Sequence, residues 1–102
     1  MRMAKVYLTG AIDRNDIEQA EARFNAATER LQGKNHSVVS SLRIVRSQFC
    51  SGKAALKHLI PLLLGCEAIF LLDNWQQSDR ARIEESIARF SGMTILREQD
   101  LN

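Results

Sequence analysis

Cysteine is scarce in this chain, and its placement excludes the usual cysteine sites. Cys50 and Cys66 are the two cysteines among 102 residues. Their separation fits neither the CxxC spacing of a zinc or redox site nor the dense framework of a disulfide-stabilised domain. We therefore expect reduced, packed thiols, no metal and no cofactor.

Long hydrophobic runs are absent as well. No stretch of about 18 consecutive apolar residues occurs, as a membrane-spanning helix would need. The segment 1–5 (MRMAK) leads directly into a short strand-like segment, without the apolar run of a secretory signal. We expect no membrane association and a cytoplasmic location.

The chain also lacks a large excess of one charge. It carries 14 basic and 12 acidic side chains, a net charge of +2, and its charged fraction of 25% is usual for soluble domains. A local group of cations is interpreted as a solvated face, and it comprises Arg43, Arg46, Lys53, Lys57 and His58. Nucleic acid is not an expected partner.

The hydrophobic content is sufficient for one core. At 45% of 102 residues it can fill a single interior, and the length leaves no room for a second domain. We predict one domain over 1–102, with 97–102 as a polar tail.

Four short segments are predicted to be strands, at 5–9, 36–40, 67–73 and 93–96. The first ends at Gly10. The third, EAIFLLD, is a continuous apolar run that suits a central parallel strand covered on both faces.

Three segments are predicted to be helices. The first follows a cap at Asn15 or Asp16, ends at Gly33 and has apolar residues at helical spacing, namely Ile17, Ala20, Phe24, Ala27 and Leu31. The second is capped by Ser51 and ends at Gly65, with Pro61 expected to kink or divide it.

The third helix begins near Ser78 and ends at Gly92, and its predicted buried residues are Ala81, Ile87, Ala88 and Phe90. The remaining segment, 42–49, alternates weakly between apolar and polar residues, which indicates an irregular or weakly extended segment.

This order of elements predicts an α/β fold. Parallel neighbours need crossover connections, so strands alternating with helices favour a doubly wound, mainly parallel sheet in a flavodoxin-like or Rossmann-like three-layer sandwich. Ligands in such sheets bind outside the carboxyl ends of the strands, where the strand order reverses. The loops after 5–9 and after Asp73 are therefore the candidate ligand loops.

The first loop offers small residues and a cation, which are Gly10, Ala11, Ile12 and Arg14. Its backbone amides can face an anionic or sugar ligand, although a strand-to-helix turn also requires glycine for steric reasons alone.

The second loop and the helix after it carry the other polar candidates, which are Asp73, Trp75, Ser78, Arg80 and Glu84. A capping hydroxyl and a side chain from the second helical turn can approach one pocket at the helix N-terminus. An exposed helical carboxylate is the alternative interpretation of Glu84.

These segments together resemble a known family. Tyr7 and Gly10 frame the first loop, CEAIFLLDNW covers 66–75, and Ser78-x-Arg80-x-x-x-Glu84 opens the third helix. The pattern, over 5–96, is similar to the nucleoside 2-deoxyribosyltransferase-like proteins, and most of all to their DUF4406 branch, which is frequent in phages and prophages.

The resemblance implies a nucleoside or nucleotide ligand. It makes Glu84 the nucleophile that attacks the anomeric carbon of a deoxyribosyl group and displaces the base. It further implies that Ser78 binds a 5′-hydroxyl or 5′-phosphate, and that Tyr7 and Trp75 cover the sugar or base.

Three departures from the family pattern weaken the case for turnover. Arg80 replaces a glycine and can fill the space meant for a substrate, and Ala11 replaces a proline. Leu59 replaces an aspartate that serves as acid or base partner, and the neighbouring His58 is the candidate substitute.

Three functions therefore stay open. The chain is an enzyme cleaving or transferring the N-glycosidic bond of a deoxynucleoside or its 5′-monophosphate, a non-catalytic nucleotide-binding module, or a partner-binding scaffold. Since the core is small and the helix around 59–64 is largely apolar, we also expect a homo-oligomer.

Overall fold

Four parallel strands form one sheet in the computed structural model, which describes residues 4–48 and 52–101. In sequence order the strands are β1 (Lys5–Thr9), β2 (Ser37–Ser40), β3 (Ala68–Leu71) and β4 (Thr94–Arg97). Their spatial order is β2-β1-β3-β4, and Tyr7 of β1 lies opposite Val39 on one side and Ile69 on the other. The predicted α/β, doubly wound parallel fold is confirmed.

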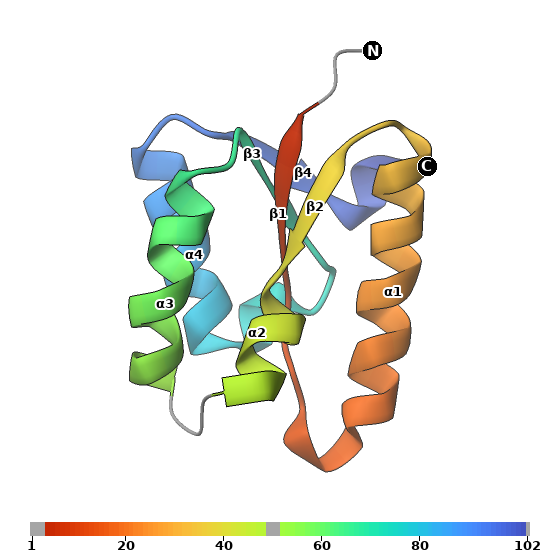
Figure 1. Cartoon of the computed structure of the whole chain (residues 1–102), viewed down its shortest axis with the longest axis vertical. Coiled ribbons are helices and arrows are strands. Elements are labelled where there is room, and N and C mark those ends of the chain that lie inside the picture. Colours follow the sequence, from red (N-terminus) through yellow and green to blue (C-terminus); the bar gives the residue numbers. More distant parts are fainter. Residues whose placement is uncertain (1–3, 49–51, 102) are drawn as a thin grey trace.

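Helices cover both faces of the sheet, as Figure 1 shows. They are α1 (Ile17–Gly33), α2 (Ser41–Gln48), α3 (Gly52–Leu64) and α4 (Asp79–Phe90), with 3₁₀ turns η1 (Arg14–Asp16), η2 (Trp75–Gln77) and η3 (Glu98–Leu101). One face packs against α1, and the other packs against α3 and α4. No helix within 4–48 and 52–101 has the length and apolar character needed to span a membrane.

Alternate residues of the central strands supply the two cores. Val6 and Leu8 point toward α1, where they pack with Phe24, while Tyr7 points to the other face and packs with Leu59. This alternation follows from the period of two in a strand. Phe24 is buried, as the apolar spacing of the first helix predicts. Asp16 is the N-terminal capping residue of α1.

The segment predicted to be irregular or extended, 42–49, is helical as far as the structure describes it. α2 begins directly after β2, and Leu42 and Val45 are both buried, one against the α1 side and the other against the α3 side. Residues three apart share one face of a helix, and this face of α2 lies against both α1 and α3, so each of the two side chains meets a different helix. Phe49 lies outside the described residues, as do Cys50 and the predicted cap Ser51.

Pro61 does not divide the second helix, because α3 runs continuously from Gly52 to Leu64. Leu59 and Leu63, one on either side of the proline, are fully buried, and their packing offsets the missing backbone hydrogen bond. Gly65 ends this helix as predicted, since its amide donates to the carbonyls of Pro61 and Leu62.

One expectation for the C-terminal part was wrong. Phe90 is 95% exposed, because the buried face of α4 contains Glu84, Glu85 and Ala88, and a residue two positions beyond Ala88 points the opposite way. After β4 the segment predicted to be a polar tail contains η3, and Glu98 accepts a hydrogen bond from the amide of Asp73 at 3.1 Å.

Candidate functional site

Glu84 is a fully buried carboxylate that faces β1. The hydroxyl of Tyr7 donates to Oε2, and the hydroxyl of Thr9 donates to Oε1 at 2.6 Å. Tyr7 and Thr9 are two apart on one strand, so both side chains point to the α4 face. The carboxylate is thereby tied to β1 through both of its oxygens.

Arg80 closes the remaining side of this carboxylate. Its Nη1 donates to Glu84 Oε1 at 2.8 Å and to Thr9 Oγ1 at 3.1 Å, and its Nη2 donates to the carbonyl oxygen of Gly10 at 2.9 Å. The Arg80 side chain is 10% exposed. Arg80 and Glu84 are four apart on α4, a spacing that places them on adjacent turns of the same face. The guanidinium therefore lies across the carboxyl end of β1.

The electrostatics of the group follow from burial. Burial, and then the negative charge of Glu84, raise the pKa of Tyr7 far above its usual value, so the phenol stays protonated and acts as a donor. Glu84 accepts from two hydroxyls and one guanidinium, and bonds of the latter kind are charge-assisted. The arrangement fixes the carboxylate firmly, but it offers no exposed oxygen to a substrate.

The buried hydroxyl of Ser41 extends this network. Ser41 lies at the junction of β2 and α2, and its hydroxyl donates to Thr9 Oγ1 at a distance of 3.4 Å. Thr9 was not among the predicted site residues, and neither was Ser41. A polar residue at the end of an otherwise apolar strand, two after Tyr7, was the available signal for Thr9.

The first loop is positioned by close packing against the residues after β3. A Cβ on Gly10 would come within 2.8 Å of the Cβ and Cδ1 of Leu72, so this position requires glycine. The amide of Ala11 donates to Asn74 Oδ1 at 3.1 Å. Ile12 is half-buried between both cores, and Arg14 is exposed.

The other predicted residues surround the Glu84 network without joining it. Ser78 caps α4, accepting from the amide of Ala81 at 3.1 Å. Trp75 packs in the same core as Tyr7, whereas the Asp73 side chain is exposed. Leu59 is fully buried, and His58, the candidate substitute for the missing acid, is exposed on α3.

A hollow of about 220 Å³ lies beside this network, at the carboxyl ends of β1 and β3. Its lining includes Ala11, Asp13 and Arg23 on the α1 side and Asn74 and Gln77 after β3. The chain leaves β1 toward one edge of the sheet and β3 toward the other, so this is the place where the strand order reverses. Glu84, on the α4 side of the sheet, is not one of the lining residues.

The part of the chain that the structure describes contains no cluster of side chains suited to bind a metal ion. No group of three or more His, Cys, Asp or Glu side chains gathers there as a metal site would require. The carboxylates of the hollow, Asp13 and Asp16, instead accept hydrogen bonds from the backbone amides of Asn15 and Gln19.

Comparison with known proteins gives one match. The model of the domain of unknown function DUF4406 matches residues 4–97, which is nearly the whole chain. Neither the curated proteins nor the solved structures contain a match. The loop after β1, the Glu84 network and the helix that carries it all fall inside the matched range, and the chain belongs to the DUF4406 family.

Proposed function

We propose that this DUF4406 domain binds a nucleoside or nucleotide without turning it over. The proposal combines the resemblance to nucleoside 2-deoxyribosyltransferase-like proteins with one observation. Arg80, at the place of the glycine in that pattern, pairs with Glu84 and bridges it to the Gly10 carbonyl.

The chemical argument concerns access to the carboxylate. A nucleophile must bring a lone pair to the anomeric carbon, at a site that its activating partners leave open. Here Glu84 is fully buried, and Tyr7, Thr9 and Arg80 occupy its oxygens. Moving Arg80 away would leave a buried charge with two neutral donors, at a cost of several kcal/mol.

The hollow at the carboxyl ends of β1 and β3 is the proposed ligand site. Small-molecule pockets usually enclose about 300–1,000 Å³. A volume of about 220 Å³ therefore suits a sugar ring, with the base lying outside it. The side-chain amides of Asn74 and Gln77 are suitable partners for sugar hydroxyls.

The test compares the wild type with Arg80→Gly and Arg80→Gly/Glu84→Ala. We expect deoxynucleosides or their 5′-monophosphates to raise the melting temperature of the wild type, since a ligand of the folded state stabilises it by mass action. We expect none of the three proteins to release free base, because Glu84 does not line the proposed ligand site. Slow base release by Arg80→Gly that is lost in the double variant would contradict this site and place the sugar against Glu84 instead.

Arg82→Gly is the matched control, because Arg82 lies on the same helix, is exposed and pairs with Asp79. It introduces the same helix-weakening glycine without touching Glu84. Absence of ligand binding in every variant would contradict the proposal and leave the partner-binding scaffold as the better explanation.

An active N-glycosidase is the second candidate, and the two hydroxyl donors favour it. Tyr7 and Thr9 donate to different oxygens of Glu84, which fixes the plane of the carboxylate beside the end of β1. In that case the wild type itself releases base, and Glu84→Ala lowers the rate on the order of a thousandfold or more.

A further inference from the structure

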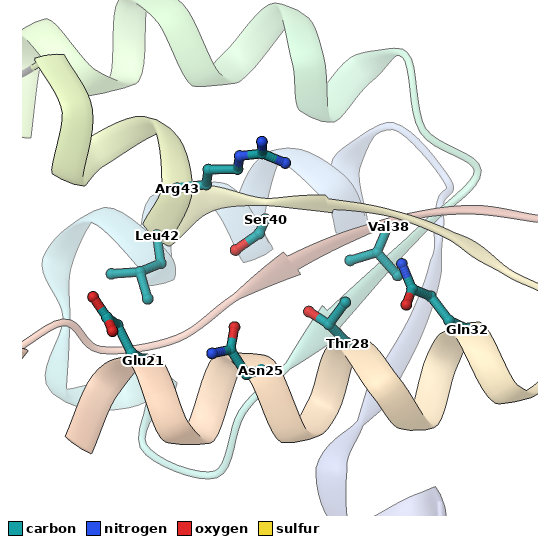
Figure 2. Close-up of a pocket in the computed structure, with 8 residues that line it drawn as sticks. All are labelled: Glu21, Asn25, Thr28, Gln32, Val38, Ser40, Leu42 and Arg43. Carbon is teal, nitrogen blue, oxygen red and sulfur yellow. The ribbon is translucent and has the colours of Figure 1, made fainter. Parts of the chain in front are cut away.

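A second, larger hollow lies between α1 and the β2–α2 segment (Figure 2). It encloses about 620 Å³, within the usual range of about 300–1,000 Å³ for small-molecule sites. None of its lining residues belongs to the Glu84 network or to the hollow beside it. It is therefore a separate candidate site.

The α1 wall is a straight row of polar side chains, formed by Glu21, Asn25, Thr28 and Gln32. Their spacing of four, three and four residues keeps them on one helix face over about 16 Å. Figure 2 shows them rising from α1 toward β2 and α2. The two carboxamides can each donate and accept, while the Thr28 hydroxyl donates to the Phe24 carbonyl at 2.8 Å and keeps acceptor capacity.

The opposite wall combines aliphatic surface with one hydroxyl. Val38 and Ser40 are alternate residues of β2 and share the face toward α1, and Leu42 follows at the start of α2. In Figure 2 the side chains of Ser40 and Leu42 point toward α1, and Val38 lies near Gln32 at the far end. A ligand here meets carboxamides on one side and aliphatic groups on the other.

The charges of the lining disfavour an anionic ligand. Glu21 and Arg43 are the charged residues of the lining, and in Figure 2 the Arg43 guanidinium points away from α1 whereas Glu21 points toward the opposite wall. A phosphate would bring its negative charge close to Glu21. No aromatic side chain is among the lining residues, so a nucleobase would find no ring on which to stack.

We propose that this hollow binds an uncharged, polyhydroxylated molecule of monosaccharide or disaccharide size. Hydroxyl groups both donate and accept, which matches the carboxamides of Asn25 and Gln32 and the hydroxyl of Ser40. The C–H faces of such a molecule can rest on Val38 and Leu42. The proposal is independent of the nucleoside site, because the two sites share no residue.

The test is a titration of the ¹⁵N-labelled protein with glucose, sucrose and myo-inositol, followed by NMR. We expect saturable shift changes along the row from Glu21 to Gln32 and at Val38–Arg43, with a dissociation constant on the order of 1 mM. Ser41, one residue from two lining residues, should respond as well. Glucose 6-phosphate should bind more weakly than glucose.

The variant Asn25→Ala/Gln32→Ala should weaken binding about tenfold or more, because two hydrogen-bonding groups are lost. Both residues are exposed, so the fold should persist, and thermal unfolding checks this. Gln76→Ala removes an exposed carboxamide on η2 and should leave the affinity unchanged.

Three results would overturn the proposal. The first is the absence of a saturable response to any of the three uncharged probes. The second is an unchanged affinity in the Asn25→Ala/Gln32→Ala variant, or a response centred on Ala11 and Asn74. The third is binding of an uncharged five-residue peptide in the hollow in place of the sugars, which would identify an extended polypeptide as the occupant.

Discussion

Raising the pH above about 10 should progressively destabilise this protein, because its folded surroundings oppose the ionisation of Tyr7. Burial and the neighbouring Glu84 raise the pKa of Tyr7 above its ordinary value of 10.0. The folded state therefore keeps the phenolic proton at a pH where the unfolded chain releases it. The contribution of this pKa difference to the free energy of unfolding is complete below about pH 10. Above that it falls by about 1.4 kcal/mol for each further pH unit.

The burial of Cys66 acts in the same direction, because it raises the pKa of that thiol above 9.0. The thiol is thus also more easily deprotonated in the unfolded chain. Its contribution to the free energy of unfolding begins to fall from about pH 9 upward. Together the two groups predict a steep alkaline loss of stability.

The assay is direct because Tyr7 is the single tyrosine of the sequence. Ultraviolet absorbance of tyrosinate then reports Tyr7 alone, and it should rise only where circular dichroism shows unfolding. Tyr7→Phe is the control: it should start about 1–3 kcal/mol less stable, since Glu84 loses a donor, and it should lose stability less steeply above pH 10. Tyrosinate forming near pH 10 in a protein with native circular dichroism would refute the reasoning.

Three other predictions concern packing and assembly. Arg80→Met should lower the free energy of unfolding by about 3–5 kcal/mol, because Glu84 stays buried without its cation. Adding Glu84→Gln should recover part of this loss. Additive losses of the two substitutions in urea unfolding would show that the two residues are not coupled. Gly10→Ala should cost about 1–3 kcal/mol through the clash with Leu72, whereas Gly33→Ala, which enters open space, should be neutral or stabilising in the same assay. We expect a homo-oligomer at micromolar concentration, and sedimentation equilibrium giving the monomer mass would contradict this.

The strands and the first helix could be predicted because local pattern and tertiary contacts agree there. Within the run at 67–73, residues 68–72 are all apolar, and β3 among them is buried on both faces. In α2 they disagree: Ile44 and Val45 favour extended structure locally, but α2 contacts both α1 and α3 through one helix face that carries Leu42 and Val45. Such contacts come from α1 and α3 and are not visible in the segment itself.

The candidate site was predictable in its position and less so in its contacts. The loops after β1 and β3 do meet, as the topology requires, and Ala11 is joined to Asn74. The partners of Glu84 depend on how α4 is rotated against β1, which a sequence pattern does not specify. Phe90 shows the same limit, because a modest rotation of α4 decides which side chains reach the core.

The hydrogen bond between Tyr7 and Glu84 joins residues that are 77 positions apart. During synthesis β1 can pair with β2 early, across about 30 residues, but β3 and α4 must emerge before the second half of the sheet and the Glu84 network can form. Forming contacts between residues so distant in sequence costs conformational entropy, because a long loop must close, and it slows the folding of a domain. A nascent chain that stops before α4 would hold Tyr7 and Thr9 against an open face, and these hydroxyls would depend on water until the last third of the protein arrives.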